Sequence, residues 1–480
     1  MKNQRNLIFW LSIGSLCFLK YLLSGFAYYP TIDDYIGYNY YFNLPSSGFF
    51  ADVFNNLAQL RPRFAAELFD QFVIAPFWDK MWISLCIITL LHIVSAYLFT
   101  QAFRAIDYSC SPVFVIIYLL IPMAFEAAYW VIAGARVIVG LFFVSLALWL
   151  YTKNHKALFG IALFISFGFY EQVTIVGFLL AMLVVYKMNG RKDIKQYTIP
   201  VLCLFAIGIY YVFIAEKGTR GSIVTGEQLW HQIKYTYSEV LRAFYRGFFV
   251  LNANGFVRGM GILMHNLWYA AIVVAVSIIA VLSAPELPHG KKPHILTLTA
   301  LLVAPLLMFF VFENSIVPFR NIYVCIIPLG IFVASLVDRF VGNRLAQQVL
   351  MLIIILFFMP ANVSETNDYK QVFLADKTIC ENIIEHIDDD VRTLNRDLVL
   401  VGSKWWYVPQ NVSHREHIYN VTQSNWALAG ALHHYLGNQV AVMVADEVSL
   451  EMLTNGDLVL IIDDEMNVSE LNFSAFQGGI

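Results

Sequence analysis

The chain has 480 residues, of which 59% are hydrophobic and only 14% are charged, and its formal net charge is −3. Soluble domains usually carry about 25% charged residues, so this composition excludes a soluble globular enzyme, a disordered chain and a nucleic-acid binder with a basic face. A mean hydropathy of +0.63 and an aromatic content of 16% indicate a polytopic membrane protein, because Trp and Tyr gather at bilayer interfaces.

Apolar runs of membrane-spanning length recur along the first three quarters of the chain. A spanning helix needs roughly 20 apolar residues, and clear runs begin near residues 7, 81, 109, 137, 197, 267, 294, 320 and 345. The first run reaches about residue 29, which is too long for the apolar part of a signal peptide. We therefore expect an uncleaved first helix.

The apolar run over residues 157–186 is longer than one crossing and has basic residues on both flanks. Cytoplasmic flanks are enriched in Lys and Arg, and a single crossing would put the two flanks on opposite sides. A hairpin of two short helices that turns at Glu171 and Gln172 satisfies the charge rule. The sequence thus predicts about eleven crossings, with the N-terminus inside and the C-terminus outside.

The same topology divides the chain into a transmembrane domain, residues 1–360, and a C-terminal domain, residues 361–480. The transmembrane domain has two long outer loops, residues 30–80 and 216–266. In the C-terminal domain, residues 398–402 and 458–462 have the pattern of buried strands, and residues 369–387 have the pattern of an amphipathic helix. We expect a small α/β domain outside the membrane.

Two adjacent carboxylates, Asp33 and Asp34, follow the first apolar run at the predicted outer surface. Acids next to a bilayer are unfavourable unless they have a role, and a carboxylate there can accept a proton from a sugar hydroxyl as a general base. The alternative is that Asp33 caps a short helix over residues 34–43.

Several arginines also lie on the predicted outer side. Arg61 and Arg63 flank a proline before an amphipathic segment; guanidinium groups bind phosphate in a bidentate manner, although lipid headgroups are an alternative partner. The second outer loop has apolar residues at helical spacing, which favours an interfacial amphipathic helix that could also line a groove for a lipid phosphate. The further candidates are Arg320 for phosphate and, for substrate binding, Glu126, Arg136, Glu171, Gln172, Arg242 and Arg246.

An Asp-Asp pair in the first outer loop, followed by Arg-Pro-Arg before the second helix, resembles the membrane glycosyltransferases of the GT-C fold. Within that class the chain is similar to the bacterial, often prophage-encoded O-antigen glucosyltransferases that cause serotype conversion. The similarity covers the length, the outward C-terminal domain and the Phe-Tyr-Glu-Gln sequence that ends at Gln172.

The resemblance implies an all-α, GT-C-like membrane protein with an extracytoplasmic α/β domain, located in the bacterial inner membrane with its C-terminal domain in the periplasm. It implies inverting transfer of a sugar, glucose by analogy, from an undecaprenyl-phosphate donor to O-antigen of lipopolysaccharide or another surface glycan. Asp33 would be the base and Asp34 would orient the acceptor or support the site. Arg61, Arg63 and Arg320 would hold the donor phosphate, and a donor-lipid synthase and a flippase are possible partners.

The absence of several known motifs limits which sugar donors and cofactors the protein is expected to use. The sequence has no P-loop and no glycine-rich dinucleotide motif, which argues against a soluble nucleotide-sugar donor or ATP coupling. The six cysteines form no metal-type pair, so no disulfide framework and no zinc motif is predicted. No cofactor and no nucleic-acid partner is predicted, and the metal dependence of the transfer stays open. Two alternatives also stay open: a transporter or lipid flippase, and an O-antigen polymerase or ligase for polyprenyl-linked glycans.

Overall fold

A computed structural model of the chain describes residues 2–39, 63–108, 111–190, 193–214, 224–285, 293–312, 316–394, 396–413, 417–445 and 457–471. The chain divides into two compact units. Unit 1 comprises Met1–Ala27 and Ser46–Thr366, and unit 2 comprises Tyr28–Pro45 and Asn367–Ile480. Unit 2 therefore includes the segment around Asp33, which the sequence analysis assigned to an outer loop of the transmembrane domain.

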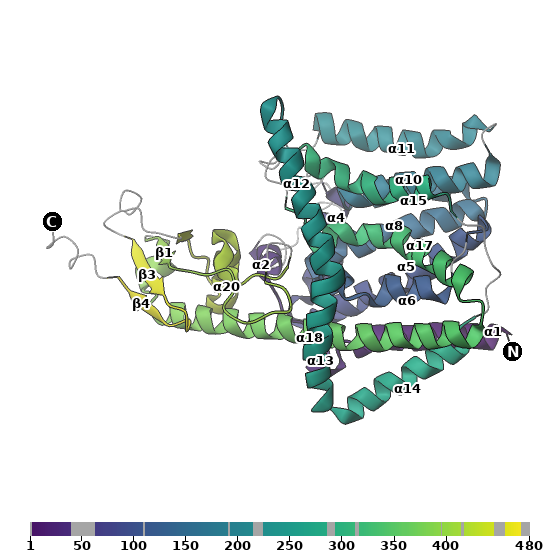
Figure 1. The fold of residues 1–480 in the computed structure, drawn as a ribbon. Coiled ribbons are helices and arrows are strands. Elements are labelled where there is room, and N and C mark those ends of the chain that lie inside the picture. The colour runs from purple at the N-terminus through teal and green to yellow at the C-terminus, as the bar shows by residue number, and fades with distance from the viewer. Residues whose placement is uncertain are drawn as a thin grey trace. The chain divides into compact units, whose positions relative to one another are not determined.

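Unit 1 is built from helices (Figure 1). Its longer helices are α1 (Lys2–Leu19), α5 (Trp82–Ala105), α6 (Pro112–Leu120), α8 (Val131–Thr152), α9 (Lys156–Phe167), α10 (Glu171–Asn189), α11 (Thr198–Ile209), α12 (Glu227–Tyr245), α13 (Leu251–Met264), α14 (Leu267–Ser283), α15 (Ile295–Val303), α17 (Ile326–Phe340) and the first part of α18 (Arg344–Ile384). Shorter helical segments join them: η1 (Leu22–Ser24), α4 (Phe64–Phe69), η3 (Asp70–Ile74), η4 (Ala75–Lys80), η5 (Pro122–Ala124), α7 (Phe125–Tyr129), η6 (Ile194–Tyr197), η7 (Tyr210–Ile214), η8 (Arg246–Val250), η9 (Ala304–Phe310), α16 (Phe319–Ile322) and η10 (Tyr323–Cys325).

The length and composition of these helices identify a multi-pass membrane protein. Among the described residues, 6 helices are long and apolar enough to cross a bilayer, or up to 8 if each of 2 sharply bent helix pairs is one span. Two shorter apolar helices, Lys156–Phe167 and Ile295–Phe310, accompany them. The described spans do not reach the predicted number of about eleven crossings, which stays a prediction.

The long apolar run over residues 157–186 is divided into two helices. α9 ends at Phe167 and α10 begins at Glu171, so the predicted break is present. A Cβ on Gly140 of α8 would lie 3.0 Å from the side chain of Val173 in α10, and the same close packing recurs further along both helices, between Gly177 and Val144. α8 and α10 are therefore parallel neighbours that begin at the same end of unit 1.

Basic residues gather where these two helices end. The side-chain amide of Asn189, the last residue of α10, donates to the hydroxyl of Tyr151 near the end of α8. Lys187 lies on the same part of α10, with its ammonium 5.2 Å from the centre of the Tyr108 ring, and Lys153 caps the end of α8. This end of unit 1 thus carries the basic residues that the charge rule assigns to the cytoplasmic side.

α12 and α13 run across the other helices of unit 1 (Figure 1). One side of α12 places polar side chains against the protein: Gln232 and Thr236 are buried and donate hydrogen bonds to the carbonyl of Phe309. Large apolar and aromatic side chains of this helix are instead exposed, namely Trp230, Tyr235, Tyr237, Leu241 and Tyr245. A helix that exposes aromatic residues and buries polar ones fits contact with the membrane interface, in line with the predicted interfacial helix.

Unit 2 contains a four-stranded sheet with the order β2-β1-β3-β4. β1 (Leu398–Val401) is parallel to β2 (Val442–Ala445) and to β3 (Leu458–Ile462), and β4 (Val468–Glu470) is antiparallel to β3. The two strands predicted from the sequence are β1 and β3. The helical segments of this unit are α2 (Ile32–Gly37), the last part of α18, α19 (Asp389–Arg392), η11 (Val421–Gln423) and α20 (Asn425–Leu436).

The amphipathic helix predicted over residues 369–387 is not a separate element. α18 continues for 41 residues through Pro360. At 1.5 Å per residue such a helix is about 60 Å long, roughly twice the hydrocarbon thickness of a bilayer. The apolar first part can therefore span the membrane, while the polar last part belongs to unit 2.

Candidate functional site

The two adjacent carboxylates of unit 2 have different environments. Helix α2 begins at Ile32 with Thr31 as its N-cap, so Asp33 and Asp34 are the second and third helical residues. Asp34 is fully buried, and its Oδ2 accepts hydrogen bonds from the Tyr28 hydroxyl at 2.6 Å and from the Thr31 backbone N–H at 2.9 Å. This is the side-chain half of a capping box, in which the third helical residue reaches back to the N-cap.

Asp33, by contrast, is partly exposed and forms no hydrogen bond or ion pair with the residues that the structure describes. The alternative that Asp33 caps a helix over residues 34–43 is wrong, because Thr31 occupies the N-cap position. The helix therefore uses Asp34 for its own stability and leaves the carboxylate of Asp33 available for chemistry.

Helix α2 is held against α20 by close backbone contact. A Cβ on Gly430 of α20 would lie 2.4 Å from the carbonyl oxygen of Tyr35, so only glycine permits this approach. The ring of Tyr38, which caps the end of α2, packs edge-on against His433 and His434, with centroid distances of 5.2 and 5.1 Å. The position of Asp33 within unit 2 is thus fixed by long-range packing.

In unit 1, Arg63 and Glu171 form a bidentate ion pair. Nε of Arg63 lies 3.0 Å from Oε1 of Glu171, and Nη2 lies 3.0 Å from Oε2. The guanidinium also lies over the ring of Tyr170, 4.5 Å from its centroid. Arg63 is the N-cap residue of α4, and Glu171 is the first residue of α10. Arg61 lies outside the described residues.

Arg320 and Glu126 form a second pair in the same unit. Nη1 of Arg320 contacts Oε1 of Glu126, and the backbone N–H of Arg320 donates to Oε2 at 3.1 Å. The guanidinium lies 4.8 Å from the centre of the Trp130 ring. The Glu126 side chain is only 3% exposed, whereas that of Arg320 is 27% exposed. Arg320 therefore keeps a solvent-accessible part while its partner is buried.

One hydrogen bond connects the two pairs. The hydroxyl of Tyr170 donates to Oδ1 of Asn321; Tyr170 precedes Glu171, and Asn321 follows Arg320. Sequence reasoning missed both as site residues, although each is the neighbour of a predicted one. We call this group the paired-arginine cluster; its members are Arg63, Glu126, Tyr170, Glu171, Arg320 and Asn321.

A third arginine of unit 1 is also neutralised by an acid. Nη1 of Arg136 in α8 lies 3.1 Å from Oδ2 of Asp70 and donates to the carbonyl of Ile132 at 2.7 Å. The Asp70 side chain is fully buried. Sequence reasoning named Arg136 but not Asp70, because nothing in the local sequence signals a partner in a distant segment.

The remaining predicted residues lie elsewhere in unit 1. Gln172 is buried in the first turn of α10. Arg242 pairs with Glu239 one turn earlier in α12, and Arg246 is the first residue of η8. In the described part of the chain no group of three or more His, Cys, Asp or Glu side chains could hold a metal ion.

The predicted site residues thus belong to two units. Asp33 and Asp34 are in unit 2, and the paired-arginine cluster is in unit 1. Comparison of the chain with protein-family models, with curated proteins and with solved structures finds no match. The resemblance to GT-C enzymes therefore stays a prediction from the sequence motifs.

Proposed function

We propose that this protein is a polyprenyl-phosphate-dependent glycosyltransferase of the GT-C type. It would transfer a sugar, glucose by resemblance, from an undecaprenyl-phosphate carrier to O-antigen or a comparable surface glycan. The observation that carries the proposal is the difference between two neighbouring acids. Asp34 accepts hydrogen bonds from Tyr28 and from the N-cap residue Thr31. Asp33 is partly exposed and has no partner among the described residues.

The proposed reaction is an inverting displacement. Asp33 accepts the proton of an acceptor hydroxyl while the hydroxyl oxygen attacks the anomeric carbon of the donor sugar. The bond between that carbon and the phosphate oxygen breaks, and its electron pair leaves with the lipid phosphate. The products are the glycosylated acceptor, a protonated Asp33 and a polyprenyl phosphate with one additional negative charge.

The leaving phosphate needs cationic donors, and Arg63 and Arg320 are the proposed ones. Each is already paired with a glutamate, and each arginine side chain is partly exposed. A carboxylate partner fixes the plane of a guanidinium, and its other N–H groups can still donate to phosphate oxygens. The net charge of each pair is near zero, so it favours the phosphate through oriented donors rather than through excess positive charge.

The membrane location of this chemistry also belongs to the proposal. We propose an inner-membrane protein with about eleven crossings, its N-terminus in the cytoplasm and unit 2 in the periplasm. Support comes from the basic end of α8 and α10, with Lys153 and Lys187, which fits the cytoplasmic side. A polyprenyl carrier stays in the bilayer, so a reaction at the membrane edge requires no soluble nucleotide-sugar donor.

A second candidate, a transporter or lipid flippase, is favoured by ionisable residues inside unit 1. Lys20 is buried, and its ammonium donates to the carbonyl of Leu119 at 3.4 Å. His92 is also buried, with Nε2 at 2.6 Å from the hydroxyl of Tyr323. Buried ionisable groups in spanning helices are often part of a transport pathway.

The deciding experiment supplies purified protein in nanodiscs with labelled undecaprenyl-phosphate glucose and an isolated O-antigen acceptor. We expect transfer of the label by the wild type, and a loss of about 10²–10⁴-fold in rate for Asp33→Asn. Asp390→Asn, an exposed acid on α19, is the matched control and should retain full activity. Full transfer by Asp33→Asn at equal protein level would reject the base, and lipid movement without any transfer would favour the second candidate.

A further inference from the structure

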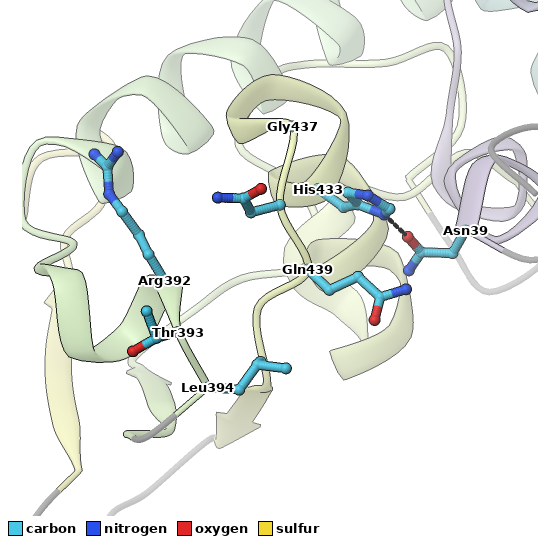
Figure 2. A pocket seen from close by; sticks show the side chains of 8 residues that line it. Asn39, Arg392, Thr393, Leu394, His433, Gly437 and Gln439 are labelled. Atoms are coloured by element: carbon cyan, nitrogen blue, oxygen red, sulfur yellow. Dashed lines mark hydrogen bonds between the residues drawn. The ribbon is translucent and has the colours of Figure 1, made fainter.

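Unit 2 contains a pocket of about 470 Å³ (Figure 2). Ligand sites usually measure about 300–1,000 Å³, so its size suits a small molecule or part of a larger one. It lies where two helices end, α19 at Arg392 and α20 at Leu436. Its lining residues are Asn39, Arg392, Thr393, Leu394, His433, Gly437, Asn438 and Gln439.

Three of the six polar side chains that line this pocket make no interaction with the described residues. Arg392, Asn438 and Gln439 are exposed, and their side chains form no hydrogen bond or ion pair with the described residues. Each amide can donate and accept at once. The described lining contains no carboxylate and a single guanidinium, so the pocket matches a neutral ligand rich in hydroxyl groups better than a cation or a strong anion.

One wall of the pocket contains a hydrogen bond between two of the lining side chains. The ring of His433 is buried, and its Nδ1 hydrogen-bonds to Oδ1 of Asn39 (Figure 2). Burial lowers the pKa of His433, which favours the neutral ring. The amide nitrogen of Asn39 is not engaged by that bond. This wall therefore offers preorganised hydrogen-bonding groups at little entropic cost.

An apolar side chain completes the lining in a strained backbone. Leu394 has φ +60° and is 53% exposed. It follows the C-cap of α19, a position that usually holds glycine because other residues are strained in the left-handed region. An exposed leucine at this position presents an apolar surface to the pocket, which suits the C–H face of a sugar ring. Strained residues of this kind cluster at ligand sites.

The pocket also adjoins the helix that carries Asp33. Asn39 lies six residues after Asp33, in the helical segment that continues α2, and it is the last residue of that segment that the structure describes. At 1.5 Å per residue the two positions are about 9 Å apart along the helix axis. An oligosaccharide could therefore occupy the pocket with one residue while another residue reaches the Asp33 carboxylate.

We infer that this pocket is a subsite for a neutral sugar residue of the acceptor glycan. The identity of the ligand as the acceptor rests on the proposed function, whereas the binding of a neutral sugar does not. The pocket would hold one residue of the glycan through the amides of Asn39, Asn438 and Gln439 and set which hydroxyl faces Asp33.

The first test measures binding without any transfer. Saturation-transfer NMR on the full chain in nanodiscs would use maltotriose, lactose and methyl rhamnoside as neutral probes, and glucuronate and inorganic phosphate as anionic ones. We expect saturable binding of at least one neutral sugar, weakened about tenfold in the Asn438→Ala/Gln439→Ala double variant, which loses two hydrogen-bonding groups. Gln371→Ala, a partly exposed amide of α18 in the same unit, should bind as the wild type does.

Three binding results would overturn the inference: no saturable binding of any neutral sugar, unchanged binding by the double variant, or tighter binding of phosphate than of every sugar. Arg392→Gln is a second test of the pocket in case the double variant misfolds, because Arg392 is exposed and forms no hydrogen bond or ion pair with the described residues. We expect this variant to fold normally and to weaken sugar binding severalfold.

The second test measures the acceptor role in the transfer assay. The double variant should raise the KM for the acceptor about tenfold with a smaller effect on kcat, because the pocket holds a different sugar residue from the one that reacts. An unchanged KM would overturn the acceptor role. If the wild type catalyses no transfer, the proposed function fails, and the binding experiment still decides whether the pocket takes a sugar.

Discussion

Arg63 and Glu171 are 108 positions apart and meet in a planar, bidentate pair with both N···O distances at 3.0 Å. Their side chains are 36% and 26% exposed, so the pair is only partly solvated. The pair orients the guanidinium, whose central carbon lies 4.5 Å from the centroid of the Tyr170 ring. A fixed guanidinium is suited to present its outer donors to an anion.

The first prediction concerns Arg63. Arg63→Lys keeps the positive charge but loses the planar fork, so the variant should lose about 10–100-fold in kcat/KM, the equivalent of one strong charge-assisted hydrogen bond. Its thermal unfolding in detergent should stay close to that of the wild type. The transfer assay measures the first effect, with Arg5→Lys, at an exposed arginine of α1, as the control. Unchanged kcat/KM in Arg63→Lys would remove Arg63 from the phosphate site.

The second prediction concerns Arg320 and its buried partner. Arg320→Leu leaves the carboxylate of Glu126, which is 3% exposed, without its guanidinium, and a stranded buried charge costs about 3–5 kcal/mol. The double variant Arg320→Leu/Glu126→Leu removes both charges and should recover most of that loss. Thermal unfolding of the full chain measures both effects. A double variant as unstable as the single one would show that the charge is not the cause.

Hydrophobic patterns over short stretches of sequence predicted the strands and the helix break that neighbouring residues determine. The hydrophobic runs of β1 and β3 and the break before Glu171 follow from short stretches of sequence, and each is present in the structure. The continuity of α18 was missed, because Pro360 and the polar residues after it are read as the end of a span. The helix nevertheless continues through Pro360, and its two parts belong to different units.

The sequence could not predict which side chains from distant segments contact one another. Asp70 meets Arg136, and Tyr170 meets Asn321, across 66 and 151 positions. The contact of α2 with α20 in unit 2 likewise includes a glycine, Gly430, that admits the backbone of Tyr35. Charge and spacing named both members of the Arg63–Glu171 and Arg320–Glu126 pairs, but only the folded chain shows that they pair with each other.

The third prediction separates the two neighbouring acids by stability. Asp34→Ala should lower the free energy of unfolding by about 2–4 kcal/mol, because a buried, charged acceptor with two donors is lost. Tyr28→Phe removes one of those donors and should cost about 1–2 kcal/mol. Asp33→Ala should change stability by less than about 0.5 kcal/mol. Equal destabilisation by Asp33→Ala and Asp34→Ala, measured by thermal unfolding, would contradict the division of roles.

The fourth prediction concerns topology. Glu381, which is 57% exposed at the end of α18, should react with a membrane-impermeant maleimide in intact spheroplasts when changed to cysteine. Lys153→Cys, at the basic end of α8, should react only after permeabilisation. Four of the native cysteines, Cys17, Cys203, Cys325 and Cys380, are buried and give little background. The reverse pattern would place unit 2 in the cytoplasm.

The last prediction concerns the contact of α13 with α18. A Cβ on Gly259 would lie 1.9 Å from the carbonyl oxygen of Pro360 and 2.4 Å from its carbon. These are backbone atoms, so the two helices would have to separate.

Gly259→Ala should therefore destabilise the protein by about 1–3 kcal/mol or more, the usual cost of overpacking. Gly261 lies on the same helix, two residues later, and a Cβ there meets nothing within 4 Å. Gly261→Ala should be neutral, or stabilising by up to about 1 kcal/mol, because alanine favours the helix. Both variants replace a helical glycine by alanine, so intrinsic propensity cancels in the comparison and only the packing differs. Thermal unfolding in one detergent measures both, and equal unfolding temperatures would show that α13 and α18 do not approach as closely as the 1.9 Å contact requires.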